Sequence, residues 1–270
     1  EADVTVTRIS EEEFWICTGA ATSNRTFNWI KNNTPSESNV FLYDITSGYG
    51  VIGLMGPKSR ALLTKLIGYE LPNQQHPFRS STEFEIGYST VRATRITYVG
   101  ELGWELQIPS EFMVNVYESI ISEGANFNLR HAGYHAMESL RIEKAYRSWG
   151  HDITPLETPL EAGLGFAVDL DKRVNFIGRE ALMKQVEHGL NQRMAVFTMS
   201  DPEPYILGNE PIFRDGEIVG RITSGYFGHT IGRSIGLGYI EAKNITVDYI
   251  KSGKYELELS MKRYPASVSL

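Results

Sequence analysis

Residues 96–109 read ITYVGELGWELQIP, a stretch in which two glycines, two glutamates and two aromatic residues follow one another closely. Residues 104–108 predict a strand, and Gly100 and Gly103 let the backbone turn before it. The acidic and aromatic groups suit a pocket for a flat, polar heterocycle, because a carboxylate accepts N–H donors from a ring edge and an aromatic side chain forms a wall. The alternative is a row of solvent-facing charges over an ordinary core. The candidate binding residues in this stretch are Tyr98, Glu101, Trp104 and Glu105.

The segments around this stretch predict an α+β fold. Strands are expected at 81–88 and 90–97 and a helix at 110–124, an order typical of helices packed on an antiparallel sheet. Apolar alternation and helical spacing predict the elements further upstream. They are strands at 3–9 and 14–18, a helix at 20–31, strands at 39–46 and 49–54, and a helix at 58–66 after Gly56-Pro57.

The last third of the chain has a different pattern. Helices are expected at 132–146 and over the segment that ends at His188-Gly189, where glycine is a typical helix stop. Beyond this point short strands follow, and Asp215-Gly216 predicts a tight hairpin. The expected strands are 194–199, 211–213, 218–223, 234–240, 246–250 and 255–260. We therefore expect two domains, residues 1–190 and a small C-terminal β-barrel or sandwich at 191–270.

Composition excludes several classes of protein. A length of 270 residues, 41% of them apolar and 22% charged, predicts a folded globular chain of two or three packed units. The net charge of −7 argues against nucleic acid as a partner, since binding phosphates requires clustered Lys and Arg. No apolar run reaches the roughly 18 residues of a membrane span. The single cysteine, Cys17, excludes an internal disulfide and indicates a buried, inert thiol in a reducing compartment.

Common catalytic and metal-binding motifs are absent. The sequence has no H-E-x-x-H, no G-x-S-x-G, no P-loop and no strand-linked G-x-G-x-x-G. His131 and His135 have the spacing of one helical turn, but no third ligand accompanies them, so we expect no metal site. The remaining acidic, aromatic and arginine residues suit a small-molecule pocket, and a reduced pterin is one ligand of the required chemistry.

Four segments carry a family resemblance. They are 96–109 (ITYVGELGWELQIP), 139–143 (SLRIE), 149–166 (WGHDITPLETPLEAGLGF) and 220–225 (GRITSG). In order and spacing they resemble the aminomethyltransferase family, which includes the glycine-cleavage T-protein and the C-terminal halves of dimethylglycine and sarcosine dehydrogenases. The form YVGELGWEL in place of YTGEDG, and KSGKY at 251–255, favour the dehydrogenase branch.

The resemblance implies a multi-lobe cloverleaf fold that binds tetrahydrofolate. Asp3 matches the strand-borne aspartate that assists one-carbon transfer near N5 and N10 of the pterin, although Ala2 replaces the first member of the family's aspartate pair. Thr5, on the same strand face as Asp3, would line the pocket. A carboxylate suits this step, because attack by the nitrogen requires removal of a proton.

The same resemblance assigns the other binding residues. Glu105 corresponds to the glutamate that holds the amino-pyrimidine edge of the pterin, with Tyr98 beside it and Glu101 as a weaker candidate. Arg141 corresponds to an arginine near the folate. Its alternative role is an ion pair with Glu138 or Glu143 on its own helix.

The expected function is the folate half of a sarcosine- or dimethylglycine-dehydrogenase-like enzyme that forms 5,10-methylenetetrahydrofolate. No FAD fingerprint is present, so FAD is expected only in an upstream flavoprotein domain, and the folate site of a fragment that lacks part of the first lobe is expected to be incomplete. The alternatives are a stand-alone T-protein that serves a lipoylated carrier protein and a non-catalytic regulatory protein on the same fold. The expected location is the bacterial cytoplasm or the mitochondrial matrix.

Overall fold

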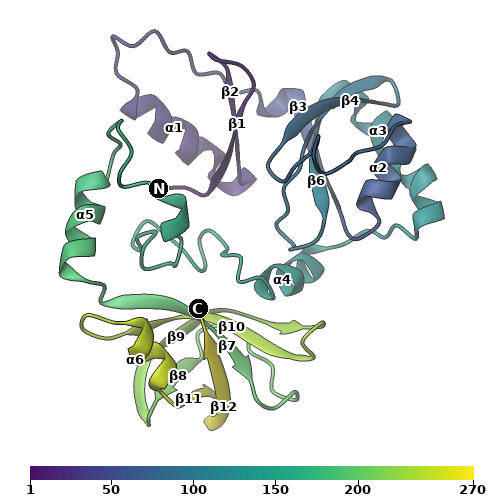
Figure 1. Cartoon of the computed structure of the whole chain (residues 1–270). Coiled ribbons are helices and arrows are strands. Elements are labelled where there is room, and N and C mark those ends of the chain that lie inside the picture. The colour runs from purple at the N-terminus through teal and green to yellow at the C-terminus, as the bar shows by residue number, and fades with distance from the viewer. The chain divides into compact units, whose positions relative to one another are not determined.

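The structure, a computed structural model, describes all 270 residues and divides into two compact units (Figure 1). One unit comprises residues 2–133 and the other comprises residues 134–270 together with Glu1. The predicted domain boundary near residue 191 falls inside the second unit, between its second helix and the barrel. No helix has the length and apolarity that are needed to cross a lipid bilayer.

The unit of residues 2–133 contains a β-hairpin, a four-stranded sheet and three α-helices. The elements are β1 (Val4–Arg8), β2 (Phe14–Thr18), η1 (Ala20–Thr22), α1 (Ser23–Asn33), η2 (Thr46–Gly48), β3 (Tyr49–Met55), α2 (Ser59–Ile67), β4 (Ser81–Ile86), β5 (Ser89–Thr94), β6 (Gly103–Pro109), η3 (Ser110–Phe112), α3 (Met113–Gly124) and η4 (Ala125–Phe127). Strands β1 and β2 form a separate antiparallel pair, while the larger sheet has the order β3-β6-β5-β4.

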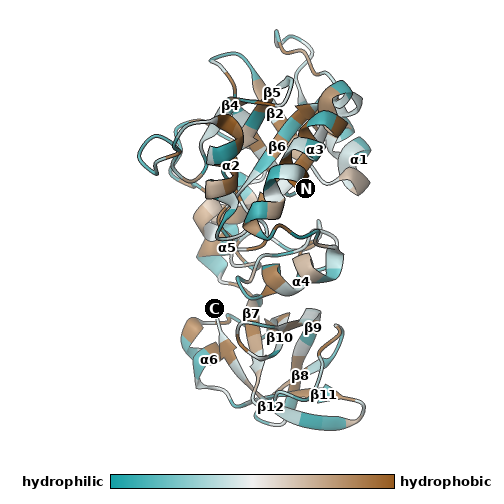
Figure 2. Cartoon of the chain, turned by 90° about the vertical axis from the view of Figure 1, so that its right-hand side faces the viewer, coloured by the Kyte–Doolittle hydropathy of each residue, from teal (hydrophilic) through white to brown (hydrophobic).

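The core of this unit lies between the four-stranded sheet and the helices α2 and α3. Alternate residues of β6, namely Trp104, Leu106 and Ile108, are fully buried and pack with apolar side chains of both helices. Figure 2 shows the corresponding brown stretches on β6 and α3. Gly103 lets β6 approach β3 closely, since a Cβ atom here would lie 2.8 Å from the carbonyl oxygen of Leu54. Packing of this one strand therefore fixes the position of the residues that alternate with the core.

The unit of residues 134–270 is a closed six-stranded barrel with preceding helices and loops. Its elements are α4 (Tyr134–Ile142), η5 (Gly165–Ala167), α5 (Arg179–His188), β7 (Gln192–Met199), β8 (Pro211–Arg214), β9 (Glu217–Gly228), β10 (Arg233–Glu241), α6 (Val247–Ser252), β11 (Tyr255–Leu259) and β12 (Lys262–Ser269). The strand order is β10-β7-β12-β11-β8-β9. Asp215 and Gly216 connect β8 to β9 with φ of 52° and 95°, so the predicted hairpin is confirmed. The α+β fold with a C-terminal β-barrel is also confirmed.

Two predicted elements are wrong and a third is too long. Residues 39–46 form no strand, and Phe41 and Tyr43 are largely exposed, because no neighbouring strand pairs with this segment. The helix predicted at 132–146 is shorter and ends at Ile142, before Ala145 with a φ of 54°. Residues 246–250 were expected to be a strand but begin helix α6.

A side-chain cap explains the helix at α6. The hydroxyl of Thr246 accepts a hydrogen bond of 3.1 Å from the backbone N–H of Tyr249, which is the geometry of a helix N-cap. Strand β12 was not predicted, because the turn before it, Ser260-Met261, has positive φ at both residues without a glycine to indicate it.

The cap leads to a stability prediction. We expect Thr246→Ala to lower the free energy of unfolding by about 1 kcal/mol, because the N–H of Tyr249 loses its acceptor. Urea unfolding followed by circular dichroism measures this change. Thr246→Ser is the matched control, since it keeps the hydroxyl; equal loss in both variants would contradict the role of the cap.

Candidate functional site

The sheet face opposite α2 and α3 is polar. Glu105 and Gln107 alternate with the core residues of β6 and therefore lie on this face. Directly paired strand residues share a face, so the register places Thr94 beside Glu105 and Arg92 beside Gln107. The next strand adds Ser81 and Glu83. We call the resulting set the polar face: Ser81, Glu83, Arg92, Thr94, Glu105 and Gln107.

The hairpin β1–β2 lies against the polar face. The guanidinium carbon of Arg92 is 5.3 Å from the ring centroid of Trp15, whose ring also meets Tyr49 edge-on at 5.0 Å. Cys17 and its strand partner Thr5 are on the same side of the hairpin as Trp15, as the alternating burial indicates. The opposite side carries apolar residues that are exposed, namely Val4, Val6, Phe14 and Ile16.

Burial perturbs three ionisable groups in this region. It raises the pKa of Glu105, whose carboxylate makes no hydrogen bond or ion pair within the chain. Partial desolvation also raises the pKa of Asp3, immediately before β1, although this residue is exposed to solvent. The pKa of Cys17 is raised first by burial and then by the negative charge of Glu105. The raised pKa favours the protonated thiol of Cys17 at neutral pH. The residue is half-buried, whereas its sequence context predicts a buried one.

Tyr98 and Glu101 lie in the loop that joins β5 to β6, which turns at Gly100 with a φ of 73°. Both side chains are half-buried. Trp104, in contrast, does not form a pocket wall beside Glu105. It is 1% exposed in the core, on the other face of β6, with the guanidinium groups of Arg60 and Arg95 over its ring. Because successive side chains of a strand point to opposite faces of the sheet, Trp104 and Glu105 cannot line the same pocket.

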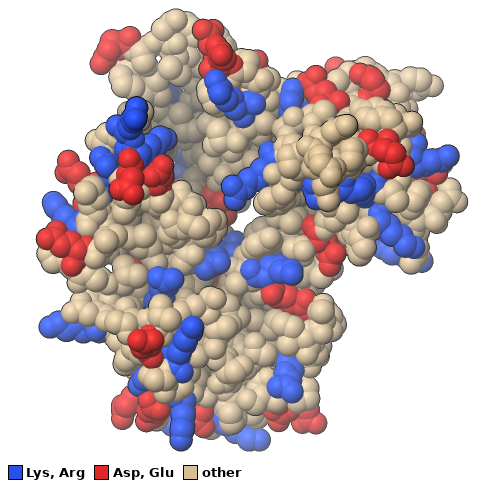
Figure 3. All heavy atoms as spheres, in the orientation of Figure 1, with Lys and Arg blue, Asp and Glu red and all other residues tan.

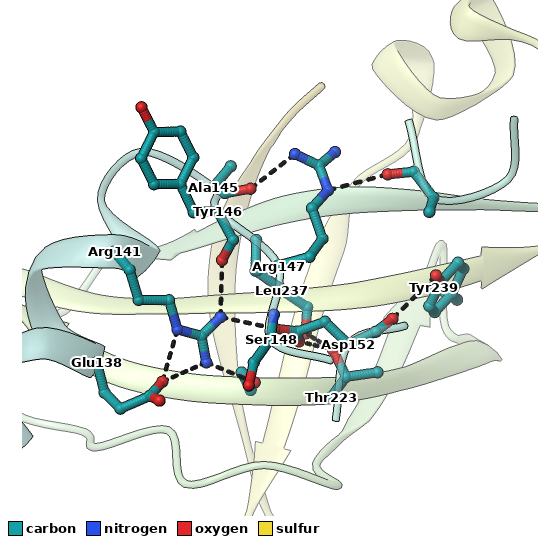
Figure 4. A network of polar contacts seen from close by, with 12 residues as sticks. Glu138, Arg141, Ala145, Tyr146, Arg147, Ser148, Asp152, Thr223, Leu237 and Tyr239 are labelled. Atoms are coloured by element: carbon teal, nitrogen blue, oxygen red, sulfur yellow. Dashed lines mark hydrogen bonds and ion pairs between the residues drawn. The ribbon is translucent and has the colours of Figure 1, made fainter. Parts of the chain in front are cut away.

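Arg141 is also a structural residue in this fold. All five of its N–H donors are used within the second unit (Figure 4). Nε bonds Glu138 at 2.6 Å, Nη1 bonds Asp152 at 2.6 Å and the Tyr146 carbonyl at 2.9 Å, and Nη2 bonds Ser224 at 2.9 Å and Glu138 at 2.5 Å. With a side chain that is 1% exposed, it has no donor left for a folate. The ion pair with Glu138 that the helical spacing allows is present, but it is buried instead of lying on the surface.

Asp152 completes this network, and sequence reasoning did not single it out. Its carboxylate is fully buried and accepts from Arg141, from the backbone N–H of Ser148 at 2.8 Å and from the hydroxyl of Thr223. The hydroxyl of Tyr239 donates to its carbonyl oxygen at 3.0 Å. Thr223 and Tyr239 belong to β9 and β10, so the network fastens the loop after α4 to the barrel.

The two histidines with helical spacing do not share a helix. Helix α4 begins at Tyr134, and His131 lies before it, where its Nε2 is 2.8 Å from the hydroxyl oxygen of Tyr117. No group of three or more His, Cys, Asp or Glu side chains has an arrangement that could hold a metal ion. Acidic and basic side chains are interspersed on the face drawn in Figure 3.

Comparison with known proteins gives the family. Residues 1–172 match the model of the GCVT N-terminal domain, and residues 192–270 match that of the glycine cleavage T-protein C-terminal barrel domain. The chain belongs to the glycine cleavage T-protein family. Its fold is that of the aminomethyltransferase T of the glycine cleavage system from Bartonella henselae, with a TM-score of 0.84 and 23% identity over 100% of this chain and 71% of that one.

Two longer proteins are similar over the whole chain. Human mitochondrial sarcosine dehydrogenase is 37% identical, with 31% of its length covered. The mitochondrial regulatory subunit of pyruvate dehydrogenase phosphatase from Mus musculus is 32% identical, with 32% of its length covered. The chain thus spans about a third of the length of these relatives. The predicted resemblance to the T-protein family and to its dehydrogenase members is confirmed.

The buried network leads to a stability prediction. We expect Asp152→Asn to lower the free energy of unfolding by about 3–5 kcal/mol, because the guanidinium of Arg141 loses a buried counter-charge. The half-exposed pair of Arg263 and Glu258, 3.7 Å apart, is the matched control, and Glu258→Gln should cost less than about 1 kcal/mol. Urea unfolding measures both changes, and similar small losses would show that Arg141 does not need its buried partner.

The raised pKa of Glu105 leads to a pH prediction. The folded state holds this proton more tightly than the unfolded chain, so the free energy of unfolding falls as pH rises from the unfolded value near 4.5 through the raised folded value. Glu105→Gln removes this loss. We expect the variant to be more stable than the wild type at pH 7 and the advantage to vanish below about pH 4, where both states are protonated. A pH-independent difference in urea unfolding would refute the prediction.

Proposed function

We propose that this chain binds tetrahydrofolate and transfers a one-carbon unit to it. The observation that carries the proposal is Glu105, a half-buried carboxylate without an internal partner on the polar face. A buried charge without a partner is costly, so a ligand that donates N–H groups to it would be bound strongly. The amino-pyrimidine edge of a pterin supplies such donors. The family membership supports the same ligand class.

The proposed pocket lies between the polar face and the inner side of the hairpin. Glu105 would bind the pterin edge, Thr5 would line the hairpin side, and Tyr98 and Glu101 would contribute from the loop before β6. Neither Trp104 nor Arg141 belongs to the proposed pocket, because one lies in the core and the other has no free donor. Cys17, which sequence reasoning treated only as an inert thiol, lies beside Thr5 and within the electrostatic range of Glu105.

Asp3 is the proposed catalytic residue. When a nitrogen of tetrahydrofolate attacks formaldehyde, a C–N bond forms, the carbonyl π bond breaks and the nitrogen loses a proton; closure onto the second nitrogen then releases water. A carboxylate next to these atoms accepts the proton and stabilises cationic forms of the carbon. Partial desolvation raises the pKa of Asp3 above its ordinary value, which makes its carboxylate a better proton acceptor.

The similarity to sarcosine dehydrogenase suggests where the one-carbon unit originates. We propose that it is released by oxidative demethylation of an amine in an associated flavoprotein part, which would carry the FAD, and that the product is 5,10-methylenetetrahydrofolate. The other similar proteins correspond to two alternatives. One is an aminomethyltransferase that receives the group from a lipoylated carrier, and the other is a non-catalytic regulatory protein. The retention of Asp3 and Glu105 favours an active enzyme. The proposed compartment is a bacterial cytoplasm or a mitochondrial matrix.

Ligand binding tests the role of Glu105. We expect Glu105→Ala to weaken tetrahydrofolate binding at least about ten-fold, because a charge-assisted hydrogen bond contributes about 1.5–3 kcal/mol. Isothermal titration calorimetry measures the affinity. Glu101→Ala, in the neighbouring loop, is the matched comparison and should have the smaller effect; unchanged affinity of Glu105→Ala would remove Glu105 from the site.

Catalysis tests the role of Asp3. With tetrahydrofolate and formaldehyde, the protein should form methylenetetrahydrofolate faster than the spontaneous reaction, as absorbance or chromatography records. Asp3→Asn should lower kcat by about 10² or more while tetrahydrofolate affinity changes little, because it removes the proton acceptor and preserves the shape. A protein that binds tetrahydrofolate without any acceleration would instead support the regulatory alternative.

A further inference from the structure

Two buried polar atoms on the polar face have no hydrogen-bond partner. They are Oε1 of Gln107 and Nε of Arg92. Gln107 is 7% exposed and the side chain of Arg92 is 14% exposed. Buried polar atoms are nearly always hydrogen-bonded in folded proteins, so an unpaired acceptor beside an unpaired donor requires an explanation.

The register places these two groups together and next to Glu105. Arg92 and Gln107 are direct cross-strand partners on β5 and β6, which brings their Cβ atoms to roughly 5 Å of each other. Gln107 is two residues from Glu105 on the same face of β6, a spacing of roughly 7 Å. A carboxylate, an amide oxygen and a guanidinium N–H therefore share one small area of the sheet.

Existing contacts of Arg92 leave its Nε–H group available. The Nη2 atom pairs with Glu83, and the guanidinium carbon lies 5.3 Å from the ring centroid of Trp15. Neither contact gives the Nε–H group an acceptor, since Nε has no hydrogen-bond partner within the chain. Trp15 holds Arg92 over the sheet, and its N–H bonds Glu13 at 2.9 Å. The donor is thus held in place without being satisfied.

We propose that Gln107 and Arg92 form a second recognition pair in the tetrahydrofolate site, which binds the lactam edge of the pterin. The ring N–H donates to Oε1 of Gln107, and the neighbouring ring carbonyl accepts from Nε–H of Arg92, while Glu105 binds the 2-amino group. This inference rests on the proposed function, because it assigns the residues that distinguish one edge of that ligand. An unpaired acceptor and an unpaired donor, side by side, are complementary to an amide edge, which offers one donor and one acceptor.

The lactam edge can be reversed chemically, which gives a specific probe. In 4-amino-4-deoxytetrahydrofolate the ring carbonyl becomes an amino donor and the neighbouring ring nitrogen becomes an acceptor. An acceptor would then face Gln107 and a donor would face Arg92, so neither hydrogen bond could form. A site that is built to bond a given group rejects an analogue without that group far more strongly than an apolar site does.

The experiment measures the affinities of both compounds by calorimetry for the wild type and two variants. Wild type should prefer tetrahydrofolate by about ten-fold or more, and Gln107→Leu should reduce that preference by about ten-fold, mainly through weaker tetrahydrofolate binding. Glu85→Gln is the matched control, since Glu85 lies on the edge strand β4 of the same sheet and bonds only Thr90 among its neighbours. It should leave both affinities unchanged.

Folding stability separates recognition from a structural role. Because Oε1 of Gln107 makes no bond that a leucine would lose, Gln107→Leu should be at least as stable as the wild type in urea unfolding. A less stable variant with unchanged preference would overturn the inference and indicate that a buried water bridges Gln107 to Arg92. Equal preference for the two compounds in the wild type would also overturn it, while the folate function stands. No binding of tetrahydrofolate by the wild type would refute the proposed function itself.

Discussion

The two-residue repeat of β6 is the constraint on which the candidate site depends. Trp104, Leu106 and Ile108 are held in the core between the sheet and its helices, which fixes the register of the strand. The residues between them, Glu105 and Gln107, must then lie on the opposite face, whatever their own preference for solvent. Burial of apolar side chains on one face thus keeps Gln107 buried and Glu105 half-buried on the other. The free energy of hydration of these two polar groups would otherwise favour exposure to solvent.

The two units treat buried charge in opposite ways. Around Arg141 every donor has an acceptor and the charge is balanced by Glu138 and Asp152, so the group serves to join a loop to the barrel. On the polar face, Glu105 has no partner and Arg92 has only part of its bonds. A satisfied network stabilises structure, whereas an unsatisfied one lowers stability and is retained where a ligand completes it.

Elements with strong periodicity or a glycine turn could be predicted from the sequence, and those that depend on tertiary contacts could not. The Asp215-Gly216 hairpin and most sheet strands follow from local pattern, but the helix at α6 depends on one hydroxyl cap and β12 follows a turn without glycine. For the site, the family resemblance supplied Asp3 and Glu105. The resemblance also placed Arg141 near the folate. A sequence cannot show that all five N–H donors of this arginine are already used within the fold. Alternation within 104–108 could have separated Trp104 from Glu105 and added Gln107.

The hairpin β1–β2 has a consequence for how a ligand reaches Glu105. Only two strands make up this sheet, and such a hairpin has little stability of its own. Its inner side is held by the contact of Trp15 with Arg92 and Tyr49, and its outer side is apolar and exposed. The hairpin should therefore open locally more readily than the four-stranded sheet, and its amides should exchange hydrogen sooner than those of β6. The rate of that opening, and not diffusion in solution, would then limit how fast a bulky heterocycle enters and leaves.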